Sequence, residues 1–249
     1  MGGGTGATWS DIRPVGAHTS KGSTSTGIIP FLKVADASMM AWNQGGTRRG
    51  SCAVYLRVDH PEILEFISMR KPTGGDANRK CWNLHHAVML TDKFMDLIQR
   101  CLKDPTADDS FNLVNPENNE VLEKVSARML WESLLTIRSQ TGEPYFMFID
   151  ECLRSTGEEY KHLQKNNRDN ITSNLCSEII QYVSPFRTAV CCLSSLNLLE
   201  FEHYQDNQEL FDDVVSMLDN AITVFIIEAM EGTPFTHNAI RGAFFERSI

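Results

Sequence analysis

The sequence lacks several patterns that would define its class by themselves. No apolar run approaches the roughly 18–20 residues of a membrane span, and the N-terminus lacks the basic and apolar regions of a signal peptide. Seven irregularly spaced cysteines without a CxxC pair form a poor disulfide framework and a poor zinc site. The 23 Lys and Arg against 32 Asp and Glu argue against a nucleic-acid binder. We therefore expect a reduced, cytoplasmic protein with no membrane span, no nucleic-acid partner and no metal ion of its own.

What is present is a globular composition, with 42% hydrophobic residues among 249. Helical spacing of apolar residues and caps predicts helices over residues 29–44, 60–69, 91–102, 125–139 and 210–228. Short β-prone runs predict strands over 52–58, 86–90, 144–149, 173–183 and 188–198. This alternation predicts an α/β fold, without an internal repeat or a convincing domain boundary.

Two polar segments interrupt this pattern. Residues 2–26 are rich in Gly, Ser and Thr and carry no apolar periodicity, which favours a linker, although such a segment can also hold a phosphate. Residues 103–120 are polar and irregular, and we expect no regular structure there.

The sharpest local feature is Asn174-Leu175-Cys176-Ser177-Glu178. In an extended segment alternate residues share one face, so Asn174, Cys176 and Glu178 are predicted to project together. An amide, a thiol and a carboxylate in a row are unusual on a core-facing strand, because each needs a hydrogen-bond partner when buried. Spacing alone favours the simpler alternative of an edge strand with a solvated polar face. Cys191 and Cys192, in a later apolar run, are by themselves best explained by core packing.

A family resemblance changes this balance. Six segments resemble, in the same order, the catalytic subunit of class I ribonucleotide reductase: NQGGTRRGSCAVYL (43–56), RKPTGGDANRK (70–80), NLHHAVMLTDKFM (83–95), GEPYFMFID (142–150), SNLCSEI (173–179) and AVCCLSSLNL (189–198). The resemblance implies part of a ten-stranded α/β barrel with a central finger loop. It covers nearly the whole chain.

The resemblance also implies roles for site residues. Cys176 matches the cysteine at the tip of the finger loop that becomes a transient thiyl radical and abstracts the ribose 3′ hydrogen. Glu178 matches the carboxylate that takes the 3′-hydroxyl proton, and Asn174 matches the amide that orients the substrate. Cys191 matches one member of the redox pair that supplies two electrons, whereas Cys192 is expected to be structural.

Three cations are implied to recognise the allosteric effector, a deoxynucleoside triphosphate or ATP. Arg13 matches an arginine that holds the effector phosphates, and Lys21 lies in the adjacent loop, at a position where the family often has a different residue. Arg79, in the 70–80 loop, is the best candidate for contact with the base. Solvated basic loops are the alternative for all of these positions.

The resemblance assigns the chain to the central portion of the family's subunit. We expect one incomplete barrel domain over 1–249, made of an effector-loop region (1–27), a first barrel half (28–150), and the finger loop with the start of the second half (151–249). Several functional features of the family have no counterpart in this sequence. They are the upstream redox cysteine, the loop for substrate phosphates, the tyrosines that pass the radical, and the C-terminal cysteines. A split gene, a gene fragment and a decayed remnant all remain open.

The expected function is the reduction of ribonucleotides, in the first place diphosphates, for deoxyribonucleotide biosynthesis. The implied partners are complementary chains of the catalytic subunit, a radical-generating small subunit that carries the metal or radical cofactor, and a thioredoxin or glutaredoxin type of reductant. Two alternatives stay open: the cobalamin-dependent class of the same enzyme, and a non-catalytic nucleotide-binding module.

Overall fold

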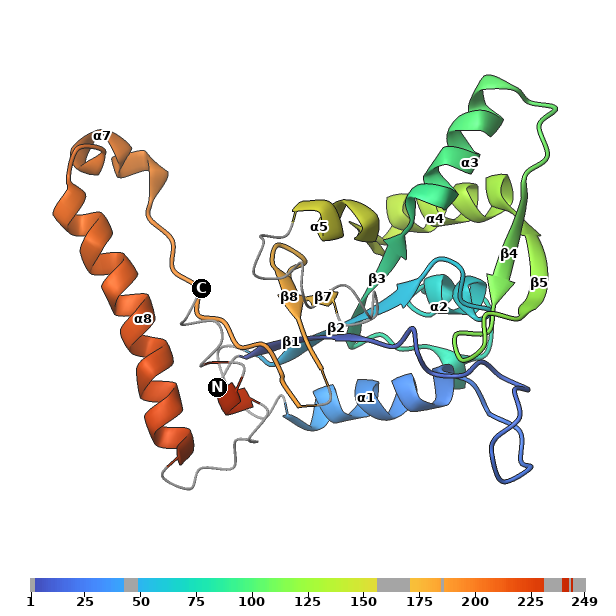
Figure 1. Cartoon of the computed structure of the whole chain (residues 1–249), viewed down its shortest axis with the longest axis horizontal. Coiled ribbons are helices and arrows are strands. Elements are labelled where there is room, and N and C mark those ends of the chain that lie inside the picture. Colours follow the sequence, from blue (N-terminus) through green and yellow to red (C-terminus); the bar gives the residue numbers. More distant parts are fainter. Residues whose placement is uncertain are drawn as a thin grey trace. The chain divides into compact units, whose positions relative to one another are not determined.

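The computed structural model describes residues 3–42, 49–155, 171–184, 186–230, 239–241 and 243. The chain divides into two compact units, Met1–Ile180 and Gln181–Ile249, and Figure 1 labels their helices and strands.

The first unit is built on a parallel sheet. Its strands are β1 (Gly4–Thr8), β2 (Ser51–Arg57), β3 (Leu84–Leu90) and β6 (Tyr145–Phe148), which lie in the order β1-β2-β3-β6. Helices α1 (Ile29–Trp42), α2 (Ile63–Ser68), α3 (Asp92–Lys103) and α4 (Ala127–Thr141) lie in the connections between successive strands. The predicted α/β class is therefore confirmed, with parallel strands joined by helical crossovers.

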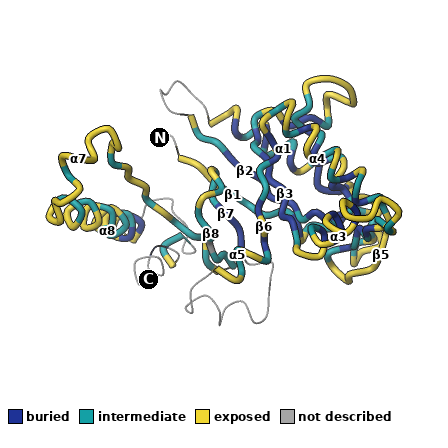
Figure 2. Tube along the Cα trace, turned by 90° about the horizontal axis from the view of Figure 1, so that it is seen from above, coloured by how far each residue is buried: buried dark blue, intermediate teal, exposed yellow. Residues whose placement is uncertain are grey.

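The two faces of the sheet are different in kind. Alternate β2 residues Cys52, Val54 and Leu56 join the large core that the helices complete. The residues between them, Ala53 and Tyr55, face a smaller cluster on the opposite side. Among the described residues, this second cluster is completed by the segment that follows β6 and by the residues around β7 and β8. Figure 2 shows β2 and β3 as the most continuously buried strands.

The helix ends follow from local chemistry. Thr91 caps α3 by accepting a hydrogen bond from the backbone N–H of Phe94, and Ser126 caps α4 by accepting one from Met129. Gly142 ends α4 in the left-handed region, at φ 78°, where a residue without a Cβ carries no steric penalty. The predicted boundaries of these two helices agree with the observed ones to within two residues.

The linker expected over residues 2–26 is wrong at its start, because Gly4–Thr8 form strand β1 and pair with β2. The irregular segment expected over 103–120 is also wrong in part. Residues Ser110–Val114 form β4, which pairs antiparallel with β5 (Val121–Ser126). Strand β1 has almost no side chains that could carry an apolar signal. A short helix, α5 (Ile149–Ser155), follows β6 directly.

The second unit is largely helical where it is described. It contains a 3-10 turn (Leu198–Glu200), α7 (Phe201–Tyr204) and α8 (Gln208–Met230), the last of which confirms the helix predicted over 210–228. The strand predicted over 188–198 is wrong, since residues 188–197 have no regular secondary structure. A strand requires a pairing partner, and an apolar run alone does not supply one. None of the described helices is long and apolar enough to span a membrane.

Candidate active site

The Cys176 segment is a turn. Strands β7 (Ile171–Ser173) and β8 (Ile180–Tyr182) form a two-stranded sheet, and residues 174–179 connect them. Ser177 takes the left-handed conformation at φ 65°, and its N–H donates to the carbonyl of Asn174 at 3.4 Å. The extended segment predicted from the spacing is therefore wrong. Cys176 is exposed in this turn, which agrees with the tip of a finger loop.

The predicted polar residues lie close together because of hydrogen bonds within the turn, and strand periodicity plays no part. Asn174 Nδ2 donates to Glu178 Oε1 at 2.7 Å, and Asn174 Oδ1 accepts from the N–H of Ile179 at 3.3 Å. Ser173 Oγ donates to the carbonyl of Ile179 at 2.5 Å and closes the base of the turn. The amide and the carboxylate therefore lie in contact on either side of Cys176 in the sequence.

The turn packs against the second face of the parallel sheet, where β1 and β2 present small residues. A Cβ built on Gly6 would lie 2.0 Å from the carbonyl oxygen of Ser173, and one built on Gly4 would lie 2.6 Å from the Leu175 side chain. Gly6 is paired in register with Ala53 of β2. The glycines of β1 are therefore required by the close approach of the turn backbone.

Two tyrosines flank the small residues. Tyr55 of β2 and Tyr145 of β6 are both paired with Ala87 of β3, so the three lie in one row across the sheet. The Tyr55 hydroxyl donates to the carbonyl of Asn174 at 2.6 Å and lies 2.7 Å from Ser177 Oγ. Tyr55 is fully buried, and burial raises the pKa of its hydroxyl. Tyr55 thus fixes the turn from below.

Tyr145 lies on the other side of Ala87. Burial raises the pKa of its hydroxyl, and the nearby Glu143 carboxylate raises it further. Its ring stacks on the ring of His85, with centroids 6.4 Å apart and planes 7° apart. These interactions link the row of tyrosines to a polar cluster at the start of β6.

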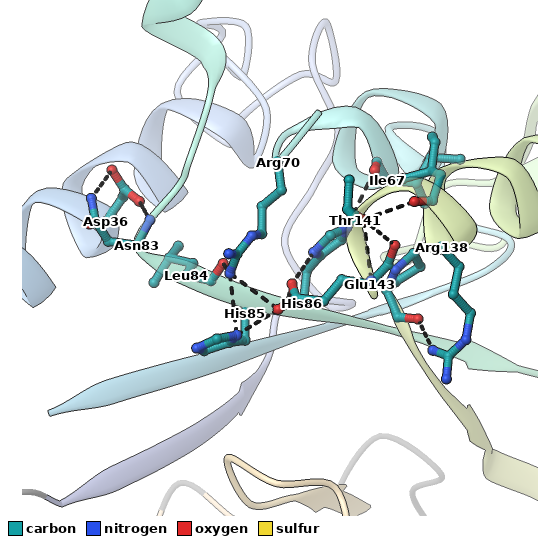
Figure 3. Close-up of polar contacts among 12 residues, drawn as sticks. Asp36, Ile67, Arg70, Asn83, Leu84, His85, His86, Arg138, Thr141 and Glu143 are labelled. Carbon is teal, nitrogen blue, oxygen red and sulfur yellow. Dashed lines mark hydrogen bonds and ion pairs between the residues drawn. The ribbon is translucent and has the colours of Figure 1, made fainter. Parts of the chain in front are cut away.

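The polar cluster is centred on Glu143 (Figure 3). Its Oε1 lies 2.6 Å from His85 Nδ1 and 3.2 Å from Arg70 NH1, and its Oε2 lies 2.9 Å from His86 Nδ1. Arg70 also donates to the carbonyl of Leu84 at 2.9 Å. One carboxylate therefore joins the residue that opens the 70–80 loop to two successive residues of β3.

The Glu143 carboxylate is ionised at neutral pH. Burial by itself raises the pKa of Glu143, but hydrogen bonds from His85 and His86 and the charge of Arg70 outweigh burial and lower the pKa to about 2. Since an ionised carboxylate only accepts hydrogen bonds, the facing ring nitrogen of each histidine acts as a donor.

Arg13 and Lys21 lie in the loop between β1 and α1. Arg13 Nε lies 3.9 Å from Glu117 Oε2, and Lys21 is exposed near the tip, beyond a bridge between His18 and Thr24. The structure thus puts the two predicted effector cations in one loop, without testing their role.

The base of this loop is held by buried groups from the start of α2. The Glu62 carboxylate accepts from the N–H groups of Ile28 at 3.0 Å and Val15 at 3.2 Å. His60 Nδ1 accepts from the N–H of Glu62, so its Nε2 carries the proton and donates to the carbonyl of Ile12 at 3.0 Å. Burial lowers the pKa of His60, in agreement with this neutral ring.

Arg79 forms a two-pronged ion pair with Glu65 of α2, in which NH2 lies 2.7 Å from Oε2. The following residue, Lys80, donates from Nζ to the carbonyl of Ser68 at 2.9 Å. The end of the 70–80 loop is thus fixed to α2, and the predicted base contact of Arg79 remains a prediction.

The cysteines divide by exposure. Cys52, Cys81 and Cys101 are buried, as expected for small core residues, and burial raises the pKa of Cys81 to about 11. Cys191 is exposed in the second unit, and its predicted redox role is not tested by the geometry of the first unit. No group of three or more His, Cys, Asp or Glu side chains able to hold a metal ion occurs among the described residues.

A cavity of about 210 Å³ lies at the carboxyl ends of the parallel strands. Its lining includes Ser10 after β1, Arg57 at the end of β2, and Thr91 after β3. Such edges commonly bind ligands in parallel sheets. The Cys176 turn does not contribute to its lining, so this cavity is separate from the candidate active site.

Comparisons with known proteins agree with this architecture. The family described as the barrel domain of ribonucleotide reductase matches residues 1–233. A candidate ribonucleoside-diphosphate reductase large subunit of Frog virus 3 (isolate Goorha) is 45% identical over 249 residues, covering 100% of this chain and 41% of the relative. The ribonucleoside-diphosphate reductase large subunit of Invertebrate iridescent virus 3 is 37% identical over 272 residues, covering 90% of this chain and 42% of the relative.

A solved structure, the class Id ribonucleotide reductase alpha subunit of Actinobacillus ureae, is similar with a TM-score of 0.72 at 27% identity. The match covers 96% of this chain and 38% of that chain. The chain therefore belongs to the ribonucleotide reductase barrel-domain family. It spans about two-fifths of the length of these two viral relatives.

Sequence reasoning missed the residues that support the turn. Gly4 and Gly6 lie in the segment that composition predicts to be a linker, although glycine at alternate positions can mark a strand that another backbone approaches closely. Tyr55 and Tyr145 stand in ordinary apolar runs, and nothing in those runs marks them. Glu143 lies between a helix and a strand, where a carboxylate is unremarkable.

Proposed function

We propose that this chain forms part of a ribonucleotide reductase catalytic subunit, which reduces ribonucleotides, in the first place diphosphates, to deoxyribonucleotides. The observation that carries the proposal is the turn itself: exposed Cys176 lies between Asn174 and Glu178, whose side chains are in contact at 2.7 Å. Membership of the barrel-domain family supports the same function.

Cys176, Glu178 and Asn174 have separate roles in the proposed reaction. A thiyl radical on Cys176 takes the 3′ hydrogen atom of the ribose, which re-forms the thiol and leaves a carbon radical. Glu178 accepts the proton of the 3′-hydroxyl as a general base, while Asn174 hydrogen-bonds the substrate and fixes its orientation. The 2′-hydroxyl leaves as water, a dithiol supplies the two electrons and becomes a disulfide, and Cys176 returns its hydrogen atom to the 3′ carbon, which restores the thiyl radical. Cys191 is proposed as one thiol of that pair.

The chemistry requires partners. Complementary portions of the catalytic subunit must cover the exposed turn, because a radical and its base need protection from water. A radical-generating small subunit would supply the oxidising equivalent and carry the metal or radical cofactor. A thioredoxin or glutaredoxin type of reductant would regenerate the dithiol. Arg13, Lys21 and Arg79 are proposed to bind a deoxynucleoside triphosphate or ATP, and we propose a cytoplasmic location.

Reconstitution tests this proposal. Reductase activity would be measured with this chain alone, then with the complementary portions of a catalytic subunit and a radical-generating subunit added. We expect no turnover from the chain alone and turnover in the complete mixture. A folded complex that binds nucleotides but has no turnover in any mixture would instead favour a non-catalytic nucleotide-binding module.

A further inference from the structure

The 70–80 loop is fixed at its two ends to different parts of the unit. Its last residues are held by α2, through the Arg79–Glu65 ion pair and the Lys80–Ser68 hydrogen bond. Its first residue, Arg70, is held instead by the sheet, through the carbonyl of Leu84 and the carboxylate of Glu143. Between these ends residues 72–78 are exposed. Any movement of the start of the loop therefore acts on Glu143.

Glu143 is connected in turn to the sheet residues beneath the candidate active site. Its Oε1 is shared between Arg70 and His85, at 3.2 and 2.6 Å. The His85 ring stacks on Tyr145, which follows Glu143 by two residues and packs against the apolar cluster that Leu175 of the turn also contacts. The contacts thus run from Arg70 through Glu143 and His85 to Tyr145, as Figure 3 shows for the first three. Leu175 is the residue next to Cys176 in the turn.

Burial makes this connection strong. The Glu143 side chain is 9% exposed and His86 is completely buried, so the ionised carboxylate depends on these partners for its solvation. Residues that share one hydrogen-bond network behave as a coupled group, and loss of one member changes the positions of the others.

We propose that Glu143 is a positioning residue that couples the start of the 70–80 loop to the Cys176 turn. This inference rests on the proposed function in one respect, the importance of Cys176. It names a regulatory connection to that cysteine which does not depend on the identity of the substrate. A change of loop conformation that withdraws Arg70 would alter the environment of the Cys176 thiol through Glu143, His85 and Tyr145.

The test uses the alkylation rate of Cys176 by iodoacetamide in the 249-residue chain, followed by peptide mass spectrometry. The exposed thiol of Cys191 in the second unit serves as an internal reference, and buried Cys52, Cys81 and Cys101 report any loss of folding. The variants are Glu143→Gln, Arg70→Gln and the double variant. Arg70→Lys, which keeps the charge, is the conservative rescue. Hydrogen exchange of residues 71–79 would be followed in the same samples.

We expect Glu143→Gln and Arg70→Gln each to raise the Cys176 rate by about threefold or more, the scale of coupling in a shared network. The double variant should add little to either single change, and Arg70→Lys should restore most of the original rate. The matched control is Glu65→Gln, which frees the other end of the loop from α2. It should raise hydrogen exchange of the loop and leave the Cys176 rate unchanged.

Equal effects of Glu65→Gln and Glu143→Gln on Cys176 would overturn the proposal, because general loosening of the loop would then explain both. An unchanged Cys176 rate in Glu143→Gln with folded cores would overturn it as well. Thiol alkylation requires no turnover, so these outcomes are separate from success or failure of the reductase assay.

Discussion

At the scale of single residues, the Glu143 carboxylate is the most strongly perturbed buried acid of the first unit. Its pKa falls from 4.5 to about 2 on folding, because His85, His86 and Arg70 stabilise the ionised form. A lowered pKa in the folded state means that this stabilisation is present above pH 4.5 and is lost as the pH falls towards 2. The free energy of unfolding therefore includes a contribution from the ionised Glu143 and its partners.

Replacement of Glu143 by Gln should therefore destabilise the chain at pH 7, by at most about 3 kcal/mol. The difference from the wild type should shrink as the pH falls from 4.5 to about 2, because the wild-type carboxyl is then protonated as well. Urea unfolding midpoints at pH 7 and pH 3 would measure this, with exposed Glu132→Gln as the matched control. A difference that grows as the pH falls would contradict the assignment.

At the scale of elements, strand β1 and the Cys176 turn form one unit of packing. The strand consists of Gly, Thr, Gly, Ala and Thr, and its glycines let the turn backbone lie directly on the sheet. Tyr55, on the neighbouring strand, then holds the turn by hydrogen bonds to Asn174 and Ser177. The position of Cys176 thus depends on residues that come more than a hundred positions earlier in the chain.

Gly6→Ala tests this packing. Its Cβ would lie 2.0 Å from a backbone oxygen, which has no rotamer to escape, so the turn must shift. We expect a loss of about 1–3 kcal/mol in the free energy of unfolding and a changed Cys176 alkylation rate. Gly3→Ala is the control, because its Cβ would meet no atom within 4 Å. Equal stability and equal Cys176 reactivity of the two variants would show that the turn does not lie against β1.

The same elements mark the limit of prediction from the sequence. Helices α3 and α4 could be predicted because their apolar periodicity and their caps at Thr91 and Ser126 are local signals. Strand β1 could not, because its glycines become ordered only by pairing with β2. The residue types of the candidate site could be chosen from the sequence, but their geometry could not. The turn is set by Tyr55, whose contact with Asn174 spans 119 residues.

At the scale of the whole molecule, the faces and edges of the parallel sheet in the first unit are covered to different extents. The sheet order makes β1 and β6 its edges among the described strands, and helices α1 to α4 contribute to the core on one face, while α5 packs against part of the other. The other face holds the Cys176 turn over small residues, with Cys176 and Glu178 exposed. The chain spans about two-fifths of two viral relatives, and we propose that complementary portions of the catalytic subunit pack over this face.

The proposed function depends on Cys176 as the residue that carries the radical, and its substitution by serine tests this role. Cys176→Ser would be compared with the wild type in a reconstituted complex that has reductase activity, with assembly checked by size-exclusion chromatography. We expect the variant to assemble normally and to have no turnover, because a serine hydroxyl does not form the radical that a thiol forms. Wild-type turnover by the Cys176→Ser complex would contradict the assignment of the radical cysteine and the function built on it.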